Sequence, residues 1–155
     1  MVRWYDGLYG GLLAGGVLVT FYWVATLTLA KDLALASFFS EIASGILKNT
    51  ATAESGWTIA FGVALYVLLT ATFGIIYAVL ARFVRAMWNA PTSVLFGLGY
   101  GLLVWFFISD VLVPVFGIVS TQPLWLGLVS DTVFYGYVIS EFITIVQRSK
   151  SVSSP

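Results

Sequence analysis

Two aspartates lie within long apolar stretches of the sequence, where an ionisable side chain is costly. Asp110 belongs to the stretch 93–119 and Asp131 to the stretch 125–146. A charge at the depth of the lipid tails costs several kcal/mol, so such a residue usually faces a cavity, meets a partner or takes part in moving ions. At a helical rise of 1.5 Å per residue, both aspartates lie roughly 9–14 Å from the same membrane surface.

If the two carboxyl groups face each other, one of them holds a proton, because two close carboxylates do not both ionise cheaply. Ser109 and Thr132 stand next to them in the sequence and can donate hydrogen bonds. This interpretation predicts a proton or cation site. The alternative is that both aspartates are hydrated near the outer headgroups, because Pro114 interrupts the third stretch and a broken helix admits water.

A third carboxylate, Glu141, lies near the other end of the last stretch. Arg82 ends the second stretch at a similar depth, and Arg148 is seven residues beyond Glu141 on the same helical face. We expect a structural salt bridge between Glu141 and Arg82 that joins the second and fourth helices, with Arg148 as a further member of the candidate site.

Several kinds of chemistry are disfavoured by composition. The sequence has no cysteine and no histidine, which removes thiol chemistry, the commonest metal and haem ligands and the usual general base near neutral pH. No catalytic motif is present. We therefore expect no catalytic site, no metal site, no cofactor and no enzymatic activity. The net charge is zero, which argues against a nucleic-acid partner.

The composition indicates a membrane protein. Apolar residues make up 60% of the 155 residues and charged residues 9%, against about 25% charged residues in soluble domains. A membrane helix needs about 20 apolar residues, and four stretches qualify. We predict an all-α domain over 1–148, with transmembrane helices at 7–30, 57–81, 93–119 and 125–146, and a short cytoplasmic tail at 149–155.

The segment 31–48 is amphipathic. Its apolar residues recur at helical spacing, while Ser37, Glu41, Ser44 and Lys48 lie on another face. It is predicted either to lie in the membrane interface as a helix or to extend the first helix.

Glycines cluster in the first and third stretches. Within each stretch, glycines are spaced four residues apart: Gly7, Gly11 and Gly15 in the first, and Gly97 and Gly101 in the third. This spacing lets the backbones of two helices approach closely. They predict tight packing within the chain or between copies. Leu8-Tyr9-Gly10 is similar to Leu95-Phe96-Gly97, and Thr70-x-x-Phe73-Gly74 to Thr132-x-x-Tyr135-Gly136, so a repeat of two helical hairpins is predicted.

Basic residues predict the orientation. Four alternating helices place the N-terminus, the 82–90 loop and the C-terminus on one side, together with Arg3, Arg82, Arg85, Arg148 and Lys150. The positive-inside rule then puts both termini in the cytoplasm.

The order of these features resembles the YagU-like group of small bacterial inner-membrane proteins. The residues that carry the resemblance are Gly10-Gly11, Gly15-Gly16, Phe73 to Ala78, Gly97 to Trp105 and Phe134 to Tyr137. The resemblance implies a multi-pass protein of the bacterial inner membrane. The family pattern often carries histidines that this chain lacks, and the family's activity is poorly defined.

Three functions remain open. The first hypothesis is a non-enzymatic membrane protein that packs into a homo-oligomer or a larger membrane complex. The second is a small transporter or channel for protons or a solute, using Asp110 and Asp131. The third is an accessory subunit that binds a lipid or a quinone. The lipid bilayer is the expected surrounding in each case.

Overall fold

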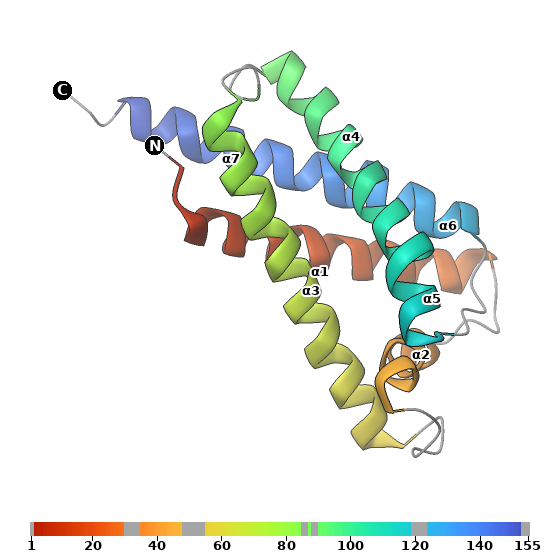
Figure 1. The fold of residues 1–155 in the computed structure, drawn as a ribbon. Helices are drawn as coiled ribbons and strands as arrows, with labels where there is room; N and C mark the ends of the chain where they lie inside the picture. The colour runs from red at the N-terminus through yellow and green to blue at the C-terminus, as the bar shows by residue number, and fades with distance from the viewer. Residues whose placement is uncertain are drawn as a thin grey trace.

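The computed structural model describes residues 2–29, 35–47, 55–84, 87, 90–118 and 124–152, and within these ranges the chain is helical without strands (Figure 1). Its elements are α1 (Trp4–Leu29), α2 (Leu35–Leu47), α3 (Gly56–Phe83), α4 (Ala90–Phe107), the π-helical segment η2 (Ile108–Leu112), α5 (Val113–Phe116), α6 (Leu124–Val129), the π-helical segment η3 (Ser130–Gly136) and α7 (Tyr137–Val152).

Four helices in the described part of the chain are long and apolar enough to cross a membrane: Trp4–Ala25, Gly56–Phe83, Pro91–Phe116 and Leu124–Lys150. The predicted all-α architecture with four such helices is confirmed. The third helix consists of α4, η2 and α5 in succession, and the fourth consists of α6, η3 and α7. These helices define the class of the protein, a multi-pass membrane protein.

The four helices form two hairpins. In the first hairpin α1 packs along α3, and in the second α4 packs along η3 and α7. The hairpins meet where α1 lies against η3 and α7, so α1 contacts both its own partner α3 and the other hairpin (Figure 1).

Glycines allow the helices of the first hairpin to touch through their backbones. A Cβ atom at Gly7 would overlap the carbonyl oxygen of Gly74, and one at Gly11 would overlap that of Thr70. Gly15 packs against the Thr70 side chain. The glycine spacing predicted from the sequence therefore serves packing within one chain.

The second hairpin repeats this arrangement. A Cβ atom at Gly97 would overlap the carbonyl oxygen of Gly136, and Gly101 lies against the backbone of Thr132. The partner helices carry small residues at matching positions, Thr70, Gly74 and Ala78 on α3 and Thr132, Gly136 and Ser140 on the fourth helix. The packing follows the predicted repeat of two hairpins.

The residues of α1 that are equivalent to those of α4 differ from the prediction. The sequence likeness pairs Gly10 with Gly97, whereas the packing makes Gly7 the equivalent of Gly97. Gly10 instead faces the ring of Phe142 on α7, because it lies on the side of α1 that contacts the other hairpin.

The repeat is not symmetric where the hairpins meet. α1 packs closely on the fourth helix, but the equivalent pair, α3 and α4, has few close backbone approaches. Side chains bridge α3 and α4 instead. The Tyr100 hydroxyl donates to the carbonyl oxygen of Phe73 at 2.6 Å, and the rings of Tyr77 and Tyr100 pack edge to face, with centroids 5.0 Å apart.

The third helix changes its winding at η2, just before Pro114. Proline has no N–H to donate and its ring crowds the preceding turn, and a widened π-helical turn is one way in which a helix absorbs such a defect. The helix ends at Gly117, whose φ of 65° is left-handed. The N–H groups of Gly117 and Ile118 donate to the carbonyl oxygens of Pro114 and Val113, a common C-terminal cap.

The C-terminal boundary differs from the prediction. Residues 149–152 belong to α7 rather than to a tail, because Lys150 in the last turn is paired with Asp6 of α1. The remainder of the predicted tail, 153–155, lies outside the described residues.

α2 is a separate helix that folds back onto α3. The close approach occurs at Gly62, where a Cβ atom would overlap the backbone of Phe39, and Gly45 of α2 packs against Ile118. The described part of the amphipathic segment therefore does not extend α1. Residues 31–34 and 48 of that segment lie outside the described residues.

Candidate functional site

A cavity of about 230 Å³ lies inside the bundle, in the half away from the termini. It occupies the side where α3 and α4 are held apart, and residues of both hairpins and of α2 line it. Because the close α1–α7 contact has no equivalent between α3 and α4, the asymmetry of the repeat creates the space.

The walls of the cavity are apolar and rich in aromatic rings. Six aromatic side chains line it: Tyr22, Phe38, Tyr66, Phe73, Trp105 and Tyr135. Aliphatic side chains such as Leu18, Val104 and Leu112 complete the wall.

Two of the tyrosines are fixed by hydrogen bonds to backbone. The Tyr66 hydroxyl donates to the carbonyl oxygen of Gly15 at 2.8 Å, and the Tyr135 hydroxyl donates to that of Thr70 at 2.8 Å. Both bonds join different helices. Their rings are therefore rigid parts of the wall, and their hydroxyl hydrogens are already committed.

Two carboxylates line the same cavity, Asp131 from η3 and Glu41 from α2. No lysine or arginine is among the lining residues, all of which belong to the described part of the chain. Ser109 and Ser130 add hydroxyl groups, and Ser130 donates within its own helix to Gly127 at 3.0 Å.

Asp131 lies in the first turn of the π-helical segment η3, inside a membrane helix. Within the described ranges its carboxylate makes no hydrogen bond or ion pair. Buried polar groups normally have partners, and π-helical turns are frequent at functional sites. An acidic group that faces a cavity, without a partner among the described residues, is available to a ligand.

The structure separates the two aspartates predicted to meet. Asp131 and Ser109 line the cavity, whereas Asp110 is exposed on η2 and is not part of the lining. The predicted facing pair therefore does not form. The widened turn of η2 leaves Ser109 on the cavity side and Asp110 outside. Thr132 is also absent from the lining, and its hydroxyl is buried without a partner among the described residues.

Two parts of this site were not predicted from the sequence. Glu41 was assigned only to the polar face of the segment 31–48, because the folding of α2 onto α3 depends on contacts distant in sequence. The tyrosines were missed because aromatic spacing on a membrane helix does not distinguish a cavity from lipid.

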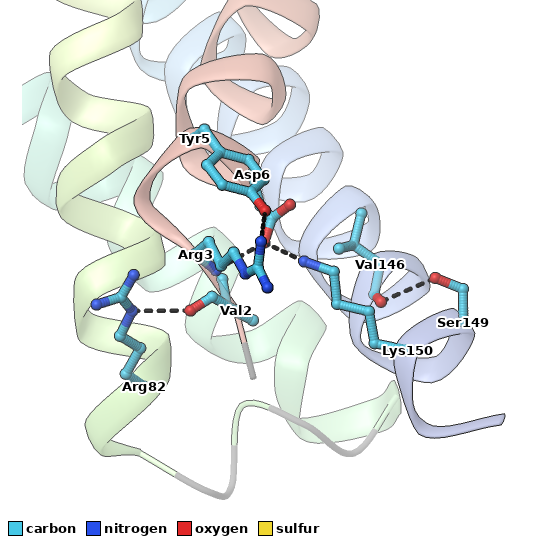
Figure 2. A network of polar contacts seen from close by, with 8 residues as sticks. All are labelled: Val2, Arg3, Tyr5, Asp6, Arg82, Val146, Ser149 and Lys150. Carbon is cyan, nitrogen blue, oxygen red and sulfur yellow. Dashed lines mark hydrogen bonds and ion pairs between the residues drawn. The ribbon is translucent and has the colours of Figure 1, made fainter. Parts of the chain in front are cut away.

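A network of polar contacts lies at the opposite end, where the two termini meet (Figure 2). The Lys150 ammonium lies 2.6 Å from the Asp6 carboxylate. The same carboxylate oxygen accepts the backbone N–H of Arg3 at 2.6 Å, which caps the first turn of α1. Asp6 therefore ties α1 to α7 and also fixes the start of α1.

The predicted salt bridge between Glu141 and Arg82 is wrong. Arg82 donates from Nε to the carbonyl oxygen of Val2 at 2.8 Å (Figure 2), and the ion pair at this end of the described chain joins Lys150 to Asp6 instead. The reason is that α1 packs against both α3 and α7, which have little contact of their own. Arg148 is exposed on α7.

Comparisons of the chain with protein-family models, with curated proteins and with solved structures find no match.

Proposed function

We propose that this protein binds a small, mostly apolar molecule inside the membrane, in the cavity between its two hairpins. The observation that carries the proposal is a partly enclosed space with apolar walls and a few polar groups, which is the usual character of a small-molecule site. The proposal keeps the protein non-enzymatic and is nearest to the third hypothesis from the sequence.

The glycine contacts support this proposal over self-association. Gly7, Gly11, Gly97 and Gly101 are all in contact with a partner helix of the same chain. The motifs that favoured association are therefore already accounted for by packing within the chain.

Transport is the second candidate function. In transporters built from repeats, the substrate site lies between the repeats near the middle of the membrane, and this cavity is lined by residues of both hairpins. Binding is a step in transport, so the two functions differ in whether a bound molecule crosses the membrane.

The cellular setting is part of the proposal. We infer that the protein resides in a bacterial inner membrane, as its resemblance to YagU-like proteins implies, with both termini in the cytoplasm. The basic side chains of Arg3, Arg82, Arg148 and Lys150 belong to the end of the bundle that carries the termini, in accord with the positive-inside rule.

Native mass spectrometry of the protein in its own lipids tests the proposed function. The variant Gly127→Leu fills the cavity from α6, because Gly127 lines it and faces Trp105. Gly99→Leu is the matched control, because a Cβ atom at Gly99 meets open space. We expect a small molecule to stay bound to the parent protein and to Gly99→Leu but not to Gly127→Leu.

Two results contradict the proposal. One is that all three proteins are free of small molecules, and the other is that Gly127→Leu retains the molecule. A homo-oligomer or a complex with other subunits in the same spectra, without a bound small molecule, favours the association hypothesis.

A further inference from the structure

We propose that the cavity selects a lipophilic organic cation, a molecule with an ammonium group on a small apolar body. The inference rests on the proposed binding function and names the chemical class of its ligand.

The charge of the cavity is the first argument. Asp131 and Glu41 line it, and the lining includes no lysine or arginine. The Asp131 carboxylate has no ion pair or hydrogen bond within the described chain. An ionised carboxylate inside the membrane is costly without a counter-charge, and a cationic ligand supplies that charge.

The aromatic wall is the second argument. The faces of tryptophan and tyrosine rings attract cations, and quaternary ammonium groups are recognised by aromatic cages. Trp105, Tyr66 and Tyr135 line the cavity together with Asp131. Hydrogen bonds to backbone hold the two tyrosines in place, so these two rings are fixed before the ligand arrives.

The same features disfavour other ligands. A quinone has no positive charge to offset the Asp131 carboxylate, and three of the lining hydroxyl groups, those of Tyr66, Tyr135 and Ser130, already donate to backbone carbonyls. An anion meets the carboxylate of Asp131. The volume of about 230 Å³ is below the range of roughly 300–1,000 Å³ of sites for drug-sized molecules, which favours a ligand with few heavy atoms.

Benzyltrimethylammonium and neopentylbenzene are suitable probes, because they have the same shape and differ only in a positive nitrogen in place of a carbon. Binding of each is measured by equilibrium dialysis against the full-length protein in lipid nanodiscs, with empty nanodiscs of the same lipid to subtract partitioning. We expect the cation to bind at least about tenfold more tightly than the neutral probe.

Asp131→Asn and Asp110→Asn form a matched pair of variants, because both remove a carboxylate from a π-helical segment but only Asp131 lines the cavity. We expect Asp131→Asn to weaken binding of the cation about tenfold or more and Asp110→Asn to leave it within about twofold of the parent value. Glu41→Gln is expected to weaken binding as well.

The outcomes separate the two proposals. If the neutral probe saturates a site as tightly as the cation and Asp131→Asn has no effect, the cation inference is overturned while a binding cavity stands. If neither probe binds above the empty nanodiscs, both proposals fail. Should Asp131→Asn not fold, the comparison of the two probes on the parent protein still decides the inference.

Discussion

Asp131 and Asp110 occupy π-helical segments of consecutive membrane helices, yet Asp131 faces the cavity while Asp110 is exposed on the outside of the bundle. The two carboxylates therefore have different roles. Asp131 is placed to contact a ligand, whereas Asp110 is a surface residue, so Asp110→Asn is the control for Asp131→Asn.

The close backbone contacts at glycines predict which small residues the fold requires. Gly74→Ala and Gly136→Ala place a Cβ atom against the carbonyl oxygens of Gly7 and Gly97, so the helices must separate. We expect each substitution to lower the free energy of unfolding by about 1–3 kcal/mol, measured by titration with a denaturing detergent and followed by tryptophan fluorescence.

Glycines that face open space provide the control for this prediction. A Cβ atom at Gly16 or Gly99 meets nothing within 4 Å, so Gly16→Ala and Gly99→Ala should leave the stability unchanged or slightly raised. Equal losses of unfolding free energy at all four positions would contradict the close backbone contacts assigned to Gly74 and Gly136.

The ion pair between Asp6 and Lys150 predicts coupling between the two ends of the chain. Asp6 is buried and Lys150 partly exposed, and Asp6 also accepts the Arg3 N–H. We expect Asp6→Ala to be more destabilising than Lys150→Gln, because alanine loses the oxygen that accepts the Arg3 N–H as well as the ion pair. A double-mutant cycle should give a coupling energy of about 1 kcal/mol, and additive effects would contradict the pair.

The hydrogen bond between Tyr100 and Phe73, which joins α4 to α3, predicts a small loss of stability when it is removed. Tyr100→Phe removes the hydrogen bond to the carbonyl oxygen of Phe73 but keeps the ring that packs on Tyr77. We expect a loss of about 0.6 kcal/mol, and at most about 1.7 kcal/mol, in the free energy of unfolding. Tyr137→Phe is the control, because that side chain is exposed on α7, and an equal loss there would contradict the role of the bridge.

The proposed orientation predicts which residues a membrane-impermeant maleimide reaches. The sequence has no cysteine, so single cysteines are labelled without background. Ser149→Cys lies at the end with the termini and Gly56→Cys at the start of α3, at the opposite end. In intact spheroplasts we expect labelling of Gly56→Cys only, and of both after lysis. The reverse pattern would place the termini outside.

The helices and their glycine contacts could be predicted from the sequence, because composition and four-residue spacing are local signals. The apolar fraction indicated four spans, and the pairs Gly7–Gly11 and Gly97–Gly101 indicated close packing. Both follow from the lack of water in the membrane, which requires helices and rewards close backbone contact.

The cavity could not be predicted, because it depends on how distant parts of the chain pack. The sequence shows that Asp110 and Asp131 are at similar depth, but it does not show which way each side chain points, because a π-helical turn changes the winding of each helix. The positions of α2 and Glu41 depend on the approach to Gly62 of α3. The pairing of Asp6 with Lys150 joins residues 144 positions apart.

Photoaffinity labelling tests the central claim, that the cavity binds a ligand, most directly. The protein in lipid nanodiscs is illuminated with a small alkyl diazirine in neutral and ammonium forms, and labelled peptides are identified by mass spectrometry. We expect adducts on cavity residues such as Tyr66, Trp105 and Tyr135, suppressed by excess unlabelled compound. Adducts spread over exposed side chains such as Trp23 and Leu27, and not suppressed by competitor, would contradict the claim.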